Sequence, residues 1–472
     1  MTSAGYKIRG HKMASSPRLI HGCLMCVASF FIFGGLLAPM NSYGRLFTGL
    51  QDDLNITAVE AGWIGSVAWA SNFLISPVAV LIESYIGYRL TAVLGSVSCA
   101  ICYLTSSFMS NYIGVLLFMG FFCGSTSGVC IHSILCVLFK YFSSSAQTRA
   151  AGIPSAGGAM AVVLVTIAYE KFIPIYGWRF TIQMTSVFAA IFAIPASFLI
   201  SLNEKHFRRI SLEEDKTNGS LKNIQKLHQE EEAEEEHPMR PKNTPYDVII
   251  YEERNSWMRL LTFWRAWLIF GALMLPAMSW SVFWVNVISY FESIAMIEGD
   301  ILLYVTIMTV SDVCGKLFLV FFMNKLPWKE VNLLTTTNFI MAVVSVLFVV
   351  CPVKIVLSIC CLFIGVFRGW YNTLPYRAAV TLLEADNSDQ GITLAMLSLG
   401  IGFTIGTLPA GAIYDATGSY TYAFIINALL YLIGGLMLVL LHAHKRMRRR
   451  KLTRCNQHIG AVQFALMKET NV

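Results

Sequence analysis

The sequence predicts an all-α membrane protein in which twelve transmembrane helices form two halves of six. The first observation is composition: 56% of the 472 residues are hydrophobic and only 13% are charged, whereas a soluble domain is about 45–50% apolar and about 25% charged. The second is a series of continuous apolar runs, each long enough to cross roughly 30 Å of hydrocarbon as a helix. Because these runs do not alternate, they exclude a transmembrane barrel.

A polar interruption at 203–259 divides the apolar runs into two sets. It contains an acidic run at 230–236, and such a like-charged block cannot bury a core, so we expect a disordered cytoplasmic linker. The expected helices before the linker lie at 19–43, 60–82, 90–109, 112–139, 150–169 and 179–202, and those after it at 261–290, 300–323, 332–352, 353–376, 391–413 and 421–441. The predicted organisation is a cytoplasmic tail at 1–18, a half at 19–202, the linker, a half at 260–441 and a basic cytoplasmic tail at 442–472.

Basic residues gather at one end of the predicted helices. Lys12 and Arg18 precede the first run, Arg89 follows the second, and the stretch from Lys445 to Arg450 follows the last. Since an excess of Lys and Arg marks cytoplasmic loops, we expect both termini in the cytoplasm. Asn55 then lies in an external loop, in an Asn-Ile-Thr glycosylation sequon that is equally compatible with no modification.

The twelve cysteines do not predict a metal or disulfide framework. All except Cys455 lie within apolar runs, where a cysteine behaves as a small hydrophobe. The C-x-x-C spacings at 23–26 and 99–102 lack the second pair or the histidines of a zinc site. We therefore expect no metal and no cofactor. The chain also lacks a nucleophile elbow or phosphate loop in a polar segment, which argues against an enzyme, and we expect no nucleic-acid partner.

The two halves repeat each other at a near-constant offset. Gly152, which opens the fifth apolar run, corresponds to Gly391 at the start of the eleventh, and Gly177 before the sixth corresponds to Gly418 before the twelfth. Two parallel six-helix repeats are typical of the major facilitator fold, in which the substrate site lies between the halves near the membrane midplane.

Several local strings resemble those of the monocarboxylate transporter family (solute carrier family 16). The most specific is Ala-Gly-Ala-Ile-Tyr-Asp-Ala-Thr-Gly-Ser-Tyr at 410–420, supported by Gly-Trp-Ile-Gly-Ser at 62–66 and Tyr-Gly-Trp-Arg at 176–179. The resemblance implies a plasma-membrane carrier of small organic anions, and some family members need a single-span chaperone glycoprotein. It also shows a departure, because Asn41 stands where proton-coupled members have a lysine for proton and carboxylate handling.

Two charged residues in the eighth run are the leading candidates for the transport site. Asp312 and Lys316 stand four residues apart and therefore share a helix face. The resemblance implies that the cation receives the substrate carboxylate while the aspartate relays a proton or releases the ion pair. Arg368 in the tenth run is a candidate second anion contact. The alternatives are a structural ion pair that locks the helices and an arginine that reaches the membrane interface.

Further candidates line the expected cavity or permit movement of the helices. A cavity-lining role is considered for His132, Tyr371, Trp284 and Asn286, with plain helix packing as the alternative for each. His132 could also carry a proton near neutral pH. Small residues that permit close helix approach, and hence packing or gating, are Gly152, Gly157, Gly402 and Gly406.

These observations favour a secondary active transporter of small organic anions, with monocarboxylates as the leading class. The expected mechanism is alternating access in the lipid bilayer, and proton symport is left open. One alternative is a facilitative, proton-independent carrier of aromatic amino acids or another neutral or zwitterionic solute. An alternative of another class is a membrane sensor or scaffold that transports nothing.

Overall fold

The computed structural model describes residues 16–200, 264–294, 296–326, 328–383, 388–417 and 420–469. Within these residues it contains helices and their connections and no strand. The predicted linker at 203–259, residues 1–15 and residues 470–472 lie outside the described part of the chain.

The N-terminal half starts with one long helix and a short external segment. α1 (Ser16–Asn41) is followed by η1 (Tyr43–Arg45) and α2 (Phe47–Leu54). Asn55 caps α2 in the left-handed region at φ 51°, so the sequon lies at a helix end. Next come α3 (Ala58–Leu74) and α4 (Ser76–Ile86), which together form one span bent by 49°. The side chains of Thr57 and Glu60 cap α3 reciprocally, which fixes where that helix begins.

The other spans of this half follow the predicted apolar runs, with shifted ends. α5 (Tyr88–Ser107) is followed by α6 (Tyr112–Val115), η2 (Leu116–Phe122) and α7 (Cys123–Tyr141), which form one further span. α8 (Ser144–Phe198) contains the last two, because its backbone leaves the helical region at Gly177. That residue has φ 77° and ψ 169°, a conformation that glycine adopts without steric cost.

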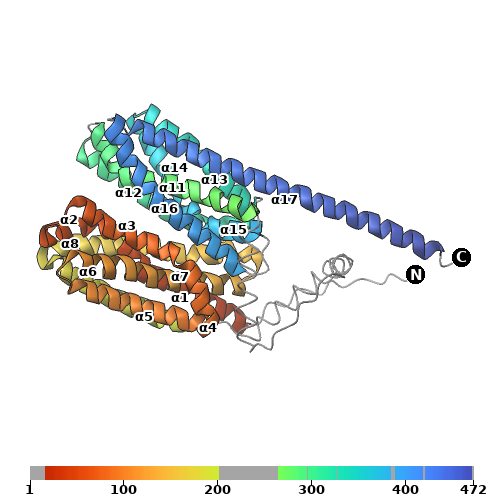
Figure 1. Cartoon of the computed structure of the whole chain (residues 1–472), viewed down its shortest axis with the longest axis horizontal. Helices are drawn as coiled ribbons and strands as arrows, with labels where there is room; N and C mark the ends of the chain where they lie inside the picture. The colour runs from red at the N-terminus through yellow and green to blue at the C-terminus, as the bar shows by residue number, and fades with distance from the viewer. Residues whose placement is uncertain are drawn as a thin grey trace, which may run out of the picture.

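The C-terminal half has the same order of spans. α11 (Trp264–Ser293), α12 (Glu298–Phe322) with η3 (Met323–Lys325), and α13 (Glu330–Val350) come first. They are followed by α14 (Lys354–Tyr371) with α15 (Leu374–Leu383), α16 (Ser388–Thr417) and α17 (Thr421–Glu469). α17 continues as a helix well past the predicted span at 421–441, and it projects from the bundle (Figure 1).

The number of spans agrees with the prediction. Nine helices among the described residues are long and apolar enough to cross a membrane, and the bent α3–α4 pair makes a tenth. α8 accounts for two spans because of its break at Gly177, and α16 supplies the remaining one. The predicted all-α fold of twelve helices in two six-helix halves is therefore confirmed.

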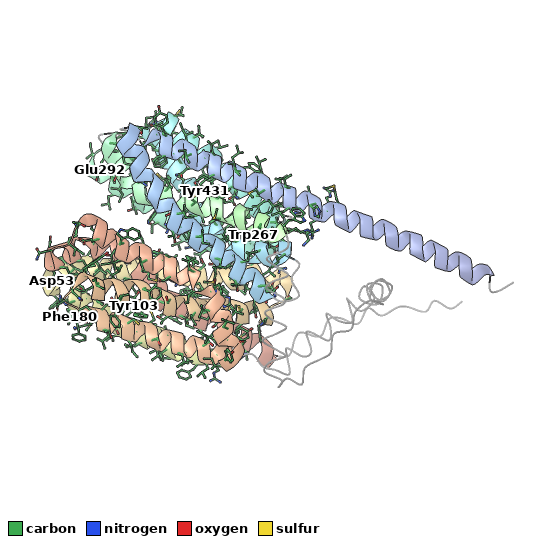
Figure 2. All side chains as sticks on the ribbon, in the orientation of Figure 1. Asp53, Tyr103, Phe180, Trp267, Glu292 and Tyr431 are labelled. Atoms are coloured by element: carbon green, nitrogen blue, oxygen red, sulfur yellow. The ribbon has the colours of Figure 1, made fainter. Side chains whose placement is uncertain are left out.

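The halves lie side by side and contact each other mainly through four helix pairs. α16 packs against α3, α4 and α7, and α12 packs against α8. One end of the bundle carries α2, and the other carries α4 and α15 (Figure 1). The Gly177 break lies at the end with α2, because the adjacent Trp178 donates to Asp53 of α2 over 2.9 Å. We call these the α2 end and the α15 end. Figure 2 shows Asp53 and Glu292 at the α2 end, one on each half.

Glycines allow the close helix contacts within and between the halves. A Cβ at Gly157 would collide with the backbone of Phe30 in α1, and one at Gly406 would collide with Met278 in α11. A Cβ at Gly152 would come within 2.9 Å of Val320 in α12, so this glycine lies in the contact between the halves. The predicted close approach therefore exists at each of these positions.

Replacement of Gly402 by alanine should destabilise the protein. A Cβ there would lie 2.5 Å from the carbonyl oxygen of Met274 and 2.8 Å from the Cβ of Ala277, so α16 and α11 would have to separate. Such overpacking costs about 1–3 kcal/mol. Thermal unfolding of Gly402→Ala in detergent should show a lower melting temperature than wild type.

The matched control is Gly62→Ala, in α3, because no atom lies within 4 Å of a Cβ built at that position. Since alanine is the better helix former, this variant should melt at or above the wild-type temperature. Equal melting temperatures for the two variants would contradict the packing described for α16.

Candidate functional site

Asp312 and Lys316 lie within α12, the helix of the C-terminal half that packs against α8 of the N-terminal half. Both side chains are 7% exposed, and Lys316 Nζ donates to Asp312 Oδ2 over 2.8 Å. Val320, one further turn along α12, meets Gly152 of α8 across the contact between the halves. Lys316 and Val320 stand four residues apart, so Lys316 shares the face of α12 on which this contact lies.

Close packing of α12 and α14 brings a second cation to this pair. A Cβ at Gly315 would lie 2.9 Å from Cα of Val366, and one at Gly369 would lie 2.6 Å from the carbonyl oxygen of Asp312. A Cβ at Gly365 would lie 2.6 Å from Ser311. These three glycines let the two backbones approach until Arg368, next to Gly369, reaches Asp312.

The three charged side chains form a cluster, which we call the charged triad: Asp312, Lys316 and Arg368. Arg368 Nε lies 4.0 Å from Asp312 Oδ1, and the arginine side chain is 14% exposed. Both atoms are buried and have no hydrogen-bond partner within the described part of the chain. Two cations therefore share one carboxylate, and the triad carries a net charge of +1 when all three groups are ionised.

Two tryptophans of α11 cover the guanidinium group of Arg368. Its Cζ lies 4.2 Å from the ring centroid of Trp284 and 4.7 Å from that of Trp280. The two indoles are stacked on each other at 5.6 Å. Aromatic faces attract a cation, most strongly where water is excluded. The tryptophans therefore hold Arg368 beside Asp312 without neutralising its charge.

The other expected cavity-lining residues do not join the triad. Asn286 is buried, and its Nδ2 donates to the Val282 carbonyl of its own helix. Tyr371 is buried and donates to the Leu273 carbonyl of α11, which is a packing contact. Asn41 is exposed at the end of α1 and donates to the Leu37 carbonyl. The structure thus places Trp284 with the triad, and Asn286, Tyr371 and Asn41 elsewhere.

His132 lies in a second polar cluster, in the contact between the halves at the α15 end. It is fully buried, with Nδ1 2.8 Å from Glu83 Oε1 and Nε2 2.9 Å from Thr393 Oγ1. Glu83 belongs to α4 of the N-terminal half and Thr393 to α16 of the C-terminal half. Glu83 has no role in the sequence prediction, although an ionisable residue at the end of an apolar run is a signal for such a site.

Two further polar links join the halves near this cluster. Lys140 Nζ of α7 lies 2.6 Å from Asp389 Oδ2 at the start of α16, and Tyr88 donates to the same oxygen. Thr148 of α8 donates to Glu330 of α13 over 3.3 Å. The aromatic rings of Phe73 and Phe403 meet at 5.6 Å between α3 and α16. The α15-end contacts, as we call them, comprise the cluster of Glu83, His132 and Thr393 and the links just described: Lys140 and Tyr88 with Asp389, Thr148 with Glu330, and Phe73 with Phe403.

The donor atoms of Glu83, His132 and Cys136 lie within 4.8 Å of one another, close enough to suggest a metal site. The sulfur of Cys136, however, lies 3.7 Å from Nδ1 and 3.8 Å from Nε2 of His132. It is therefore almost equidistant from the two ring nitrogens and far from the lone-pair direction of either. Because a zinc ligand set must converge at about 2.0–2.3 Å, these residues as placed do not fit a metal ion.

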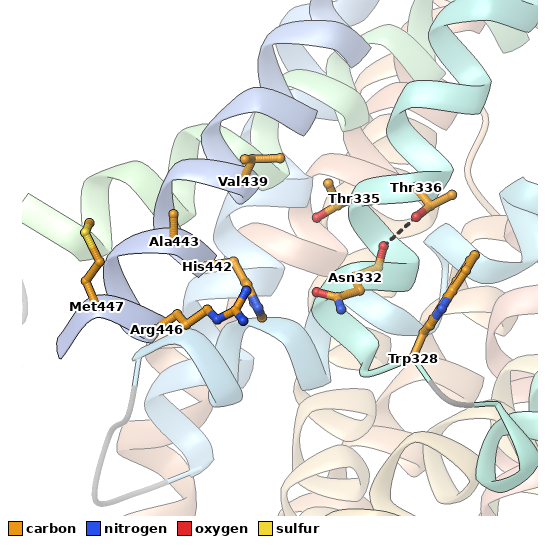
Figure 3. Close-up of a pocket in the computed structure, with 9 residues that line it drawn as sticks. All are labelled: Trp328, Asn332, Thr335, Thr336, Val439, His442, Ala443, Arg446 and Met447. Atoms are coloured by element: carbon orange, nitrogen blue, oxygen red, sulfur yellow. Dashed lines mark hydrogen bonds between the residues drawn. The ribbon is translucent and has the colours of Figure 1, made fainter. Parts of the chain in front are cut away.

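A surface cavity of about 510 Å³ lies elsewhere, between α13 and α17 (Figure 3). Its lining includes Trp328, Asn332, His442 and Arg446 and none of the charged triad. In Figure 3, Thr336 points back toward the carbonyl oxygen of Asn332, to which its hydroxyl donates over 2.9 Å. This cavity is therefore separate from both polar clusters.

A family profile described as Major Facilitator Superfamily matches residues 20–364 and 269–468, which together include both halves. The chain belongs to the major facilitator superfamily. Its members share the two-half arrangement seen here.

The named relatives support the resemblance to monocarboxylate transporters. Monocarboxylate transporter 10 of Rattus norvegicus is 24% identical over 434 residues, which cover 89% of this chain and 78% of the relative. The Homo sapiens protein of that name is 22% identical over 447 residues, covering 92% and 81%. Monocarboxylate transporter 14 of Mus musculus is 18% identical over 461 residues, covering 88% and 89%.

Solved structures of the superfamily share the fold. FucP in the outward conformation superposes with a TM-score of 0.62 at 14% identity, covering 90% of this chain and 99% of FucP. The proton:xylose symporter XylE superposes with a TM-score of 0.59 at 13% identity, covering 90% and 96%. At this identity the likeness concerns the fold alone.

Removal of the shared carboxylate should destabilise the transporter. Asp312→Asn would leave two buried cations side by side with no counter-ion, and breaking a buried pair in this way costs about 3–5 kcal/mol. Thermal unfolding in detergent should show a clearly lower melting temperature than wild type.

The double variant Asp312→Asn with Lys316→Gln restores the net charge of +1 and should recover part of that loss. If Asp312→Asn melted at the wild-type temperature, or if the second substitution lowered the melting temperature further, the charge count of the triad would be wrong.

Proposed function

We propose that this protein is a secondary transporter of small monocarboxylates in the plasma membrane, working by alternating access. The proposal also places the α15 end in the cytoplasm, because Arg89, Lys140 and the basic stretch after residue 441 lie there. The observation that carries the substrate class is the charge of the triad: two cations and one carboxylate, almost completely buried.

The charge of the triad selects the charge of the solute. At low effective dielectric an uncompensated cation attracts an anion far more strongly than it does in water. A monocarboxylate supplies one negative charge and neutralises the site, whereas a dicarboxylate would overcompensate it and a neutral solute would leave it charged. The unpaired Nε of Arg368 and the exposed edge of Trp284 provide the donor and an apolar surface for such a solute.

The position of the polar contacts between the halves supports alternating access. The polar links of the α15-end contacts hold the halves together at that end. In the proposed cycle these contacts close the end that we place in the cytoplasm. Separation of the same contacts would give a solute at the triad a route to the cytoplasm, with Gly152 of α8 sliding over Val320 of α12.

The relatives support a carrier of this class. Proteins named monocarboxylate transporters match both halves of the chain, and the superposed XylE is titled a proton:xylose symporter. A charged triad with one excess positive charge is what a carrier of monovalent anions needs. A sensor or scaffold that transports nothing has no requirement for buried, uncompensated charge.

A proton-independent carrier of aromatic amino acids is the second candidate, and the stacked Trp280 and Trp284 favour it. Such a zwitterion could place its carboxylate on Arg368 and its ring on Trp284. Its net charge is zero, however, so it would leave the triad at +1. This charge balance is the reason to prefer a monocarboxylate.

Loss of either cation should abolish transport of monocarboxylates. Lys316→Gln and Arg368→Gln each bring the triad to zero net charge, so a bound carboxylate would leave it at −1. Uptake of labelled monocarboxylates into liposomes should fall to background for both variants. The initial screen should include aromatic amino acids, so that the two candidate functions are compared on the same protein.

The matched control is Lys354→Gln. Lys354 also pairs with an aspartate, Asp300, at 2.6 Å, but its side chain is 69% exposed at the surface. This variant should transport at the wild-type rate, because an exposed pair contributes little. Wild-type uptake by Lys316→Gln or Arg368→Gln would reject the triad as the site.

An inward proton gradient should accelerate uptake. A proton on Asp312 would weaken its hold on Lys316 and Arg368 and raise the charge of the empty triad from +1 to +2, which would strengthen its attraction for a solute carboxylate until the proton is released again. Initial rates should therefore rise when the external pH is lowered while the internal pH and the membrane voltage are held fixed. Rates that do not respond would favour the facilitative, proton-independent mode.

A further inference from the structure

We propose that Glu83 and His132 form a proton-binding site that must be loaded for the α15-end contacts to close. The site is distinct from the charged triad, and the proton is bound and released at the α15 end. The proposal rests on alternation of access, as proposed above, but not on the identity of the transported solute.

The hydrogen bonds of Thr393 fix one proton of the histidine. The Thr393 hydroxyl donates to the Asp389 carbonyl, four residues earlier in α16, over 2.7 Å. A hydroxyl has only one proton to donate, so Thr393 Oγ1 must accept in its second contact. His132 Nε2 at 2.9 Å is therefore the donor and carries a hydrogen.

The other side of the ring then requires a second proton. Nδ1 lies 2.8 Å from Glu83 Oε1, which is hydrogen-bond distance. With Nε2 protonated, a neutral ring would present the Nδ1 lone pair to an ionised carboxylate, and the two would repel. One more proton, on Nδ1 or on Oε1, converts this contact into a hydrogen bond and makes the pair neutral overall.

The surroundings do not neutralise Glu83 in another way. Its Oε2 is buried and has no hydrogen-bond partner among the described residues, and the Ser133 hydroxyl of α7, which donates to Oε1 over 2.6 Å, is neutral. The nearby cation on α7, Lys140, is bound to Asp389 of α16.

The remaining titratable neighbours add no charge. Tyr88 of α5 donates its hydroxyl to Asp389, and Cys136 of α7 contributes a neutral thiol near the ring. An ionised Glu83 beside a neutral His132 would therefore be an isolated buried charge, which is costly in a low dielectric.

Opening of the contacts removes the requirement for this proton. When α16 moves away with the C-terminal half, Nε2 loses Thr393, and water can solvate both the ring and the carboxylate. The closed state therefore binds one proton more than the open state. By linkage, the equilibrium constant for opening rises with pH at the α15 end, by up to about tenfold per pH unit for one proton. An acidic compartment at this end thus holds the contacts closed.

Hydrogen–deuterium exchange of the full chain in nanodiscs tests this site without any transported solute. Peptides covering 88–93 and 388–393 report opening of the α15 end, and a peptide around Gly177 reports the α2 end. After correction for the intrinsic pH dependence of exchange, the α15-end peptides of wild type should exchange faster at pH 8 than at pH 6. An absence of this pH dependence in wild type would overturn the proposal.

The decisive variant is Glu83→Gln, which keeps the shape of the cluster and removes its need for a second proton. A Gln amide can donate to Nδ1 of a neutral His132 and to Ser133, whose own hydroxyl donates to the Val129 carbonyl. The contacts should then close equally well at both pH values, with exchange at pH 8 as slow as wild type at pH 6. A wild-type pH response in Glu83→Gln would overturn the proposal.

A pair of variants at position 393 tests the partner across the contact. Thr393→Ser keeps the hydroxyl and should retain the wild-type exchange, whereas Thr393→Val removes the acceptor of Nε2–H and should raise exchange at both pH values. Identical exchange in the two variants would contradict the assigned direction of this hydrogen bond. Failure of the transport assays would reject the proposed function and leave these results unchanged, because exchange is measured without solute.

Discussion

The organisation of this protein depends on the balance of buried charge in a low-dielectric interior. Water cannot solvate a charge between packed membrane helices, so each cation needs a carboxylate, an aromatic face or a solute beside it. Asp312 compensates one of its two cations, and Trp280 and Trp284 hold the second in place without cancelling its charge. In the function that we propose, this excess charge gives the site its affinity for a monovalent anion.

The need to balance buried charge applies also to the contact between the halves. Lys140 with Asp389 forms a pair whose charges cancel, so these residues join the halves at little electrostatic cost. Among the residues that the structure describes, the partner for the charge of Glu83 is His132, which is cationic only when it is protonated. We therefore propose that a solute completes the charge balance of the first cluster and a proton that of the second, and the two clusters lie on different helices.

Sequence reasoning predicts the elements that depend on local pattern. The spans follow from continuous apolar runs, and the Asp312–Lys316 pair follows from a spacing of four residues within one helix. Arg368 could be suspected because it is charged within a span, but its contact with Asp312 depends on Gly315, Gly365 and Gly369 letting α12 and α14 approach. The i, i+4 glycines of α14 are a readable signal for this approach.

The residues that sequence reasoning misplaces or misses are those whose partners are set by tertiary contacts. From sequence, His132 can be predicted only as a polar residue within one helix. Its role depends on the packing of α4 and α16, which places Glu83 and Thr393 beside its two ring nitrogens. Those partners are 49 and 261 residues away in the chain, so no local pattern connects them.

The most direct test of the central claim, that the charged triad binds the solute, is a structure determined with a transported monocarboxylate bound. The account predicts that its carboxylate lies within hydrogen-bond distance of Arg368 or Lys316, and a carboxylate bound elsewhere beside an unchanged triad would contradict it.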